Sequence, residues 1–356
     1  MWNIIYRIVD LGETECQIGK TAKCKMKKNP FIYNAPVIRD DFFNREEVIG
    51  KILKETVNGP SQGNVWIYGK GKVGKTSLLK FIQYNAENYN KEILVYKDRD
   101  QESKKSKVVY IYSNCQGFKT TNDFYRNLYN STTSFLKLKN EPHKSWYANF
   151  IMVLKYAYSK SYYIVFLLDE FDAFFQNLIN TDPHESSAFL GKLNALTQGI
   201  SEITFEQKVF GCVFSANCVM KYFLDLEDIK IAGSGLGYEN IQFPWFTLEQ
   251  TSQLSKFYLS HSPIKFDKKE IKFCYKLTKG YPYLTQKLFS IMYDKKRENK
   301  DNLKYLAAIK KEYEKEFDAI IKEFKNTKEQ EGILENPLET VTDIGATVIK
   351  KIIQNE

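Results

Sequence analysis

Cysteine, histidine and arginine are scarce in this 356-residue chain, and each shortage narrows its chemistry. The six cysteines are scattered without a C-x-x-C pair, so the sequence offers no zinc or dithiol motif. The three histidines lie far apart, beside Pro or Ser, which indicates neither a metal cluster nor a catalytic dyad. Only six of the 52 basic residues are arginine, so lysine carries the net charge of +9. Lysine suits a solvated surface or a loose contact with phosphate better than the bidentate recognition of nucleic-acid bases or carboxylates.

Long apolar runs are missing as well. The longest, residues 162–168, is far too short to span a membrane. Residues 1–7 lack the basic, apolar and small-residue regions of a secretory signal, so we expect a cytoplasmic protein. Hydrophobic residues make up 43% of the chain and aromatic residues 15%, which is ample for a globular core.

The most informative motif is a glycine-rich loop at residues 69–76. A strand-like run at 64–68 leads into the pattern G-x-x-x-x-G-K-[ST], and helix-forming residues follow. The glycines let backbone N–H groups wrap around a triphosphate, and the helix adds its positive N-terminal end. We expect Lys75 to neutralise the β- and γ-phosphates and the Thr76 hydroxyl to hold Mg²⁺. The residues of this loop expected to bind nucleotide are Gly69, Lys70, Gly71, Lys72, Val73, Gly74, Lys75, Thr76 and Ser77.

Two carboxylates follow the apolar run 162–168. A buried strand that ends in Asp169 and Glu170 places both groups at the carboxyl edge of a sheet, where open α/β folds bind ligands. We expect Asp169 to hold Mg²⁺ through its water shell and Glu170 to polarise the attacking water. Asp172 is interpreted as a cap for the next helix.

A further strand-like run, at 208–214, precedes Ser215 and Asn217. A short polar side chain at this place can hydrogen-bond the γ-phosphate or the water. The two residues compete for that role, and structural capping is the alternative for either of them.

The spacing of the apolar runs predicts the fold. Runs at 64–68, 107–113, 162–168 and 208–214 alternate with helical or polar stretches, which is typical of a parallel sheet buried on both faces. We therefore predict an α/β protein with a P-loop NTPase parallel sheet sandwiched by helices, followed by a small helical lid domain. The polar segment 97–107 is expected to be an exposed hairpin or loop.

The same pattern divides the chain into four parts. They are an N-terminal arm (1–28), a P-loop NTPase domain (29–240), a helical lid domain whose 3.6-residue spacing begins at Ile241 (241–300), and a lysine-rich C-terminal helix and tail (301–356). No arginine lies between Arg126 and Arg297. The lid therefore lacks the arginine finger or sensor of most oligomeric ring ATPases, so we expect slow hydrolysis.

Six elements in a fixed order carry a resemblance to a known family. They are Asn29-Pro30-Phe31, Pro36-Val37, Phe43-x-Arg45-Glu46, the glycine-rich loop, the stretch 167–172 and Gly280-Tyr281-Pro282. Over about residues 29–300 this set resembles the STAND P-loop ATPases (signal-transduction ATPases with numerous domains), especially prokaryotic AAA-like members related to archaeal replication-initiator ATPases.

The resemblance implies an ATP-switched module with ATP or ADP and Mg²⁺ as cofactors. ADP or no nucleotide would hold it closed, and ATP would open or oligomerise it. It also implies that Pro282 approaches the adenine from the lid, and that the segment before Arg45 covers the base. Family members usually carry a large effector and a repeat sensor. Neither is found in this sequence, so we expect action through a separately encoded protein partner.

These observations leave three functions open. The first is a slowly hydrolysing nucleotide switch that controls assembly with its partner, for which prokaryotic defence is one setting. The second is an ATP-dependent DNA-binding regulator of the replication-initiator or transposition-ATPase type, supported by the charge of +9 and the lysine-rich tail. The third is a nucleotide-bound structural subunit that never turns over.

Overall fold

The computed structural model describes residues 29–37, 42–43, 45–58, 63–86, 92–95, 104–139, 142, 145–198, 210–218, 238–298 and 304–333. The arm expected over 1–28 and the tail expected beyond 333 lie outside these described residues. Within them, no helix combines the length and the apolar character needed to cross a membrane.

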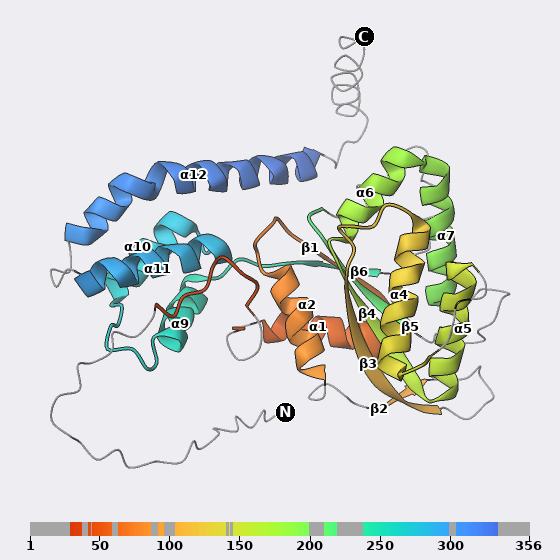
Figure 1. Cartoon of the computed structure of the whole chain (residues 1–356). Coiled ribbons are helices and arrows are strands. Elements are labelled where there is room, and N and C mark those ends of the chain that lie inside the picture. Colours follow the sequence, from red (N-terminus) through yellow and green to blue (C-terminus); the bar gives the residue numbers. More distant parts are fainter. Residues whose placement is uncertain are drawn as a thin grey trace, which may run out of the picture.

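The centre of the molecule is a six-stranded sheet with the order β2-β3-β4-β5-β1-β6 (Figure 1). Five strands run parallel, and β2 pairs antiparallel with β3 at one edge. The strands are β1 (Asn64–Tyr68), β2 (Glu92–Val95), β3 (Lys104–Asn114), β4 (Tyr162–Asp169), β5 (Phe210–Ala216) and β6 (Tyr238–Gln242). Because β1, β4 and β5 are parallel, their carboxyl ends meet at one edge of the sheet.

Strand β4 shows why the apolar runs are nearly continuous. Val165 and Leu167 belong to one hydrophobic core, whereas Phe166 and Leu168 belong to the other. All four are fully buried. Successive side chains of a strand point to opposite faces, so a sheet covered on both sides needs apolar residues at every position.

Two groups of helices cover the two faces. On one side lie α1 (Glu46–Leu53), the π-helical turn η2 (Lys54–Asn58) and α2 (Lys75–Tyr84). On the other side lie α4 (Thr121–Leu136), α5 (Trp146–Ser159), α6 (Phe171–Thr181) and α7 (Pro183–Gln198), at the right of Figure 1. The predicted α/β fold, with a parallel sheet between helical layers, is confirmed.

The helical lid is built from α9 (Leu248–Tyr258), α10 (Lys268–Thr278) and α11 (Pro282–Glu298), and α12 (Lys304–Ile333) packs along α10 and α11. Capping boxes fix where α9 and α10 begin: Thr247 pairs with Gln250, and Asp267 pairs with Glu270. The lid shares one continuous hydrophobic core with α1, α2 and the adjoining sheet face. It is therefore packed directly against the side of the sheet that carries the glycine-rich loop, residues 69–76, which we call the phosphate loop.

One local expectation is corrected by the structure. The helical pattern does not begin at Ile241, because residues 238–242 form β6 and the first lid helix begins at Leu248. The pairing partner of β6 is β1, which lies far away along the chain, so local composition does not reveal this strand. In the segment 97–107, expected to be an exposed hairpin or loop, residues 104–107 belong to β3 and pair antiparallel with the preceding strand β2, as in a hairpin.

Candidate nucleotide-binding site

The glycine-rich loop lies between β1 and α2, as the sequence predicts. Gly74 adopts a φ of 111° at the N-cap of α2, and an added Cβ would lie 3.6 Å from the Phe243 ring. The distance to the ring is an ordinary contact, but a side chain at this position would strain the backbone because of the positive φ. Among the described residues, no side chain caps α2, so its first N–H groups remain available for an anion.

Lys75 is buried, and its ammonium group is held by oxygen atoms of the protein. Nζ donates to the carbonyl oxygen of Gly69 at 2.5 Å, to that of Lys70 at 3.2 Å and to Oδ1 of Asn217 at 3.1 Å. Burial lowers the pKa of Lys75, and nearby carboxylates, Glu170 foremost, act in the opposite direction. A bound phosphate would favour the charged form and replace the backbone acceptors.

Asp169, at the carboxyl end of β4, is fully buried, and both its carboxylate oxygens accept hydrogen bonds from protein hydroxyl groups. Ser215 Oγ donates to Oδ1 at 2.8 Å, and Tyr112 OH donates to Oδ2 at 3.0 Å. Burial, together with the Asp169 charge, raises the pKa of Tyr112, so this phenol stays protonated and remains a donor. The sequence alone did not single out Tyr112, which reaches Asp169 from the neighbouring strand β3.

Glu170 follows β4 in a left-handed backbone conformation, with φ 53° and ψ 38°. This conformation is uncommon for a residue with a side chain, and it turns Glu170 into the nucleotide cavity described below. Burial raises the pKa of Glu170, the Asp169 charge adds to the shift, and Lys75 opposes it. A carboxylate with a raised pKa is a stronger proton acceptor, which fits the predicted role of activating water.

Asn217 and Ser215 occupy different places, although the sequence treats them as competitors. Ser215 donates a hydrogen bond to Asp169, whereas Asn217 accepts one from Lys75. Asp172 does not cap α6, because the N-cap is Glu170. Its Oδ2 instead accepts the backbone N–H of Asn217 at 2.9 Å and the side-chain Nδ2 at 3.0 Å. Asp172 thereby turns Oδ1 of Asn217 toward Lys75.

The N-terminal segment 29–37, which we call the strap, joins the lid to the phosphate loop. Asn29 Nδ2 donates to Asp294 Oδ2 at 2.9 Å, and the Phe31 ring packs against Phe289 at 5.4 Å. At the other end of the strap, the Val37 N–H donates to Ser77 Oγ at 3.0 Å. The strap therefore crosses from α11 to the start of α2.

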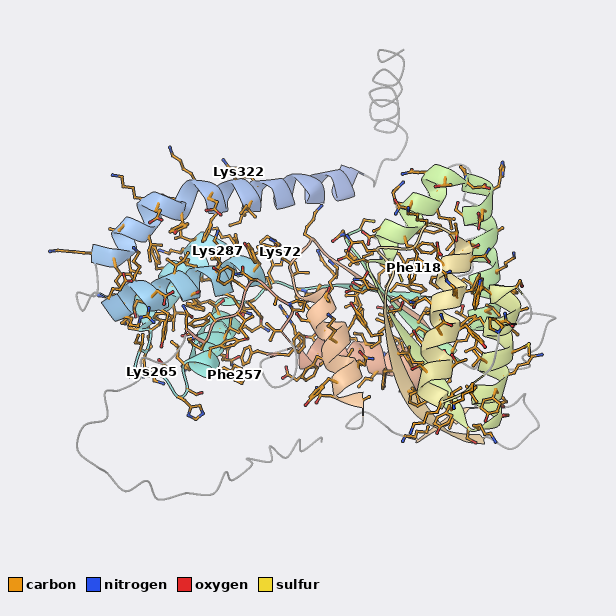
Figure 2. The ribbon with its side chains drawn as sticks, in the orientation of Figure 1. Lys72, Phe118, Phe257, Lys265, Lys287 and Lys322 are labelled. Atoms are coloured by element: carbon orange, nitrogen blue, oxygen red, sulfur yellow. The ribbon has the colours of Figure 1, made fainter. Side chains whose placement is uncertain are left out.

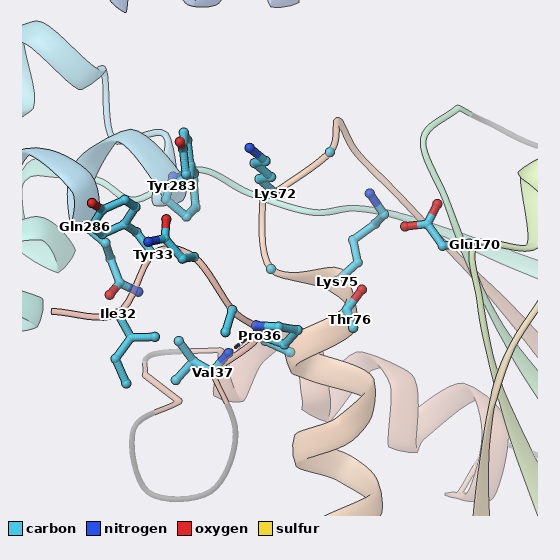
Figure 3. Close-up of a pocket in the computed structure, with 16 residues that line it drawn as sticks. Ile32, Tyr33, Pro36, Val37, Lys72, Lys75, Thr76, Glu170, Tyr283 and Gln286 are labelled. Carbon is cyan, nitrogen blue, oxygen red and sulfur yellow. Dashed lines mark hydrogen bonds between the residues drawn. The ribbon is translucent and has the colours of Figure 1, made fainter. Parts of the chain in front are cut away.

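The strap, the loop and the lid enclose a cavity of about 360 Å³, which we call the nucleotide cavity (Figure 3). Its lining comprises Ile32, Tyr33, Asn34, Ala35, Pro36, Val37, Gly71, Lys72, Gly74, Lys75, Thr76, Ser77, Glu170, Pro282, Tyr283 and Gln286. The phosphate loop and Glu170 form one wall, and the strap and α11 form the other. Pro282 and six loop residues that the sequence predicts thus line one cavity.

Two contacts bind the lid to the phosphate loop directly. The hydroxyl of Tyr281 donates to the carbonyl oxygen of Gly71, and Lys72 Nζ lies 4.3 Å from the centre of the Tyr283 ring. Gly71 and Lys72 belong to the phosphate loop, so a triphosphate bound there would alter their two contacts with the lid. A change in the conformation of the loop would therefore reach Tyr281 and Tyr283 at the start of α11.

Arg45 does not line the nucleotide cavity. Its guanidinium lies between two aromatic rings, 4.7 Å from the centre of Phe243 and 4.4 Å from that of Phe246. It lines an adjacent cavity of about 50 Å³, which Pro282 also lines. Its predicted contact with nucleotide would be made there.

The residues present fit Mg²⁺ bound together with a nucleotide. Thr76 lines the nucleotide cavity, and no group of three or more His, Cys, Asp or Glu side chains in the described part of the chain could hold a metal alone. Mg²⁺ in such sites keeps several waters and uses few protein ligands plus phosphate oxygens. Asp169, with both oxygens already accepting hydroxyls, suits contact through a metal-bound water.

Comparison with known proteins supports the fold. No family model and no curated protein match the sequence. The Walker-type ATPase PABY2304 of Pyrococcus abyssi is 15% identical with a TM-score of 0.53, and the match covers 85% of this chain and 80% of that one.

Two Orc proteins give lower TM-scores. The Orc1 protein of Aeropyrum pernix in complex with DNA has a TM-score of 0.47 at 15% identity, over 76% of this chain and 66% of that one. The Orc2 protein of the same organism, in ADPNP and ADP complexes, also scores 0.47, at 17% identity over 72% and 63%. This chain thus spans slightly less than two thirds of either protein. At these identities the likeness concerns the fold alone, and the chain has the P-loop NTPase fold.

Proposed function

We propose that this protein is a slow ATPase that works as a nucleotide switch. One observation carries the proposal: a single cavity is lined by the phosphate loop, by Glu170 and by the lid residue Pro282. A nucleotide in this cavity would contact the sheet and the lid together. Only a ligand whose contacts differ between two arrangements can shift the equilibrium between them, and a nucleotide in this cavity would make lid contacts that an open arrangement would lack.

Each residue has a distinct part in the proposed reaction. With nucleotide bound, Lys75 would leave its backbone acceptors and contact the β- and γ-phosphates, and Thr76 and Asp169 would hold Mg²⁺, which would supply charge stabilisation on the phosphates. Glu170 orients the attacking water and accepts its proton. Asn217, which already touches Lys75, is our choice for the γ-phosphate sensor. Ser215 orients Asp169 instead.

The proposed slow hydrolysis rests on the lack of an arginine side chain at the nucleotide cavity among the described residues. Of the arginines, Arg126 pairs with Asp123 and Arg297 with Asp294, both on helix surfaces, while Arg45 is stacked between aromatic rings. None of these three lines the nucleotide cavity. An arginine finger is worth about 10³–10⁵ in rate, so turnover without a partner is expected to stay below about 1 s⁻¹.

Replacing Glu170 by glutamine tests the switch. Glu170→Gln removes the proton acceptor but keeps the shape, so we expect hydrolysis to fall by about 100-fold or more, with ATP affinity within about twofold of wild type. Single-turnover phosphate release and equilibrium binding measure the two quantities. Light scattering of the ATP-bound variant then reports assembly, the proposed output of the switch.

Glu298→Gln, an exposed change at the end of α11, is the matched control and should alter neither quantity. Phosphate release at the wild-type rate in Glu170→Gln would remove Glu170 from the chemistry. An ATP-trapped variant that stays monomeric, alone and with candidate partners, would leave an ATPase without the proposed switch output.

The DNA-binding alternative draws on the net charge of +9. Lys322 projects from α12, as Figure 2 shows, and Lys310 and Lys315 of the same helix are exposed. Acidic residues such as Glu312 and Asp318 are exposed among them, so the described part of α12 does not form a surface of one charge. We therefore favour the switch.

A further inference from the structure

The outer face of helix α5 is unusually apolar for a helix at the surface. Of the 14 residues of α5, only Lys155 is charged. One side of the helix is buried in the hydrophobic core that it shares with β4 and β5. On the other side, the side chains of Met152 and Tyr156 are 54% and 40% exposed. A helix that is apolar all round is normally covered on all sides, so its exposed face has the character of a binding surface.

The exposed apolar side chains form one connected patch. Met152 and Tyr156 are four positions apart and therefore lie on the same side of α5. Lys160 Nζ lies 5.4 Å from the centre of the Tyr156 ring. Two positions further on, Tyr162 packs edge-on against Phe135 of α4, with ring centres 5.6 Å apart, and Phe135 is 43% exposed. We call Phe135, Met152 and Tyr156 the α5 patch.

The exposed charged residues that adjoin the α5 patch all have the same sign. They are Lys137 and Lys139 after α4, Lys155 and Lys160 at α5, and Lys192 on α7, whose Nζ lies 5.7 Å from the centre of the Tyr147 ring of α5. In the described part of the chain between Asp123 and Asp169, no acidic residue occurs. The patch is thus an apolar centre with a basic rim.

This combination of apolar centre and basic rim discriminates between occupants. A second copy of the chain, docked symmetrically, would bring lysines against lysines, which is repulsive. Nucleic-acid phosphates would pair with the lysines, but they would leave the apolar centre unused. A protein segment with apolar side chains between acidic ones suits both parts, because interfaces have an apolar centre rich in aromatic residues and Met, and a polar rim.

We propose that the α5 patch binds a partner protein through a segment that carries apolar side chains flanked by Asp or Glu. The patch lies on the helical layer opposite α2, away from the lid (Figure 1). None of its residues lines the nucleotide cavity, so the partner would leave the cavity accessible. The inference rests on the proposed switch for the need of a partner, whereas the surface and its test are independent of the nucleotide site.

Selection from a library of short random peptides tests the assignment on the full chain. The displayed library is selected on wild type and depleted on the double variant Met152→Ser/Tyr156→Ser, and the recovered peptides are synthesised. We expect them to combine a net negative charge with apolar residues. Their affinity, measured by fluorescence anisotropy, should be about tenfold or more lower for the double variant, because two apolar anchors are removed. Both side chains are exposed, so the variant is expected to fold.

Reversing the charge of the rim gives a second, independent readout. In Lys155→Glu/Lys160→Glu the same peptides should bind about tenfold or more weakly, and added salt should lower their affinity for wild type. Tyr84→Ser is the matched control, since Tyr84 is an exposed aromatic residue of α2 on the other helical layer. It should bind the peptides as wild type does.

Recovered peptides that are neutral or basic, or that bind the double variant as tightly as wild type, would overturn the inference. Vesicles of phosphatidylcholine and phosphatidylserine that bind wild type but not the double variant, when no peptide does so, would assign the patch to a lipid surface and overturn it as well. Dimers of wild type that the double variant loses would assign it to a second copy, with the same consequence. Failure of Lys75→Ala to weaken ATP binding would contradict the nucleotide site and leave the peptide result standing.

Discussion

Replacing Lys75 by alanine is expected to weaken ATP binding by about 30- to 1,000-fold, which corresponds to about 2–4 kcal/mol. The reason is the position of the ammonium group, which donates to carbonyl oxygens of the phosphate loop and would bring its positive charge to a phosphate bound there. Without it, the negative charges of Glu170, Asp172 and Asp169, which act on the Lys75 ammonium group, are left to repel phosphate. Calorimetry with ATP and Mg²⁺ measures the loss.

Lys155→Ala provides the control for this change, because Lys155 is exposed on α5, far from the phosphate loop. It should bind ATP as wild type does. Circular dichroism shows whether Lys75→Ala is folded. A folded Lys75→Ala protein with wild-type affinity would contradict the site.

Replacing Gly280 by alanine is expected to lower the free energy of unfolding by about 3–4 kcal/mol. Gly280 has a φ of 80°, and a Cβ there would lie 1.9 Å from the carbonyl oxygen of Phe246. The substitution therefore combines backbone strain with a backbone clash. It also forces apart the 2.9 Å hydrogen bond from the Phe246 N–H to the Gly280 carbonyl oxygen. Denaturant unfolding measures the change.

The control is Gly50→Ala in helix α1, where an added Cβ has no atom within 4 Å. This change should stabilise the protein by up to about 1 kcal/mol, since alanine favours a helix more than glycine does. Equal stability of Gly280→Ala and wild type would show that the lid moves freely away from residue 246, and the proposed coupling between lid and loop would be wrong.

Local sequence patterns were enough to predict the phosphate loop and the Asp169–Glu170 pair. A strand, a glycine-rich turn and a helix lie within about twenty consecutive residues, so composition and order specify them together. The burial of β4 on both faces was predictable for the same reason, since its run of apolar residues is uninterrupted.

Contacts between distant segments were not predictable. Within residues 239–242 of β6, whose burial is described, Ile241 is the one buried residue, and the segment is recognised as a strand by its pairing with β1. Tyr112 reaches Asp169 from 57 residues away, and Asp172 contacts Asn217 across 45 residues. No local periodicity reports such contacts, and Asp172 was therefore mistaken for a helix cap.

Gln286 was missed because a glutamine on an amphipathic helix is ordinary. Its position becomes informative only when the strap is seen against α11 and its side chain is found among those that line the nucleotide cavity. The strap itself depends on hydrogen bonds from Asn29 to residues 261 and 265 positions away. The resemblance to STAND ATPases suggested a covering segment, but not the side chains that hold it.

The central claim is that one nucleotide contacts the phosphate loop and the lid at the same time. Amide hydrogen exchange of the full chain, with and without ATP and Mg²⁺, tests it most directly, because exchange reports protection segment by segment. We predict that ATP slows exchange in the phosphate loop and the residue after it (69–77), in residues 31–37 of the strap, and in residues 280–286, which lead into and begin α11. Protection confined to the loop, or absent from both walls, would contradict the account.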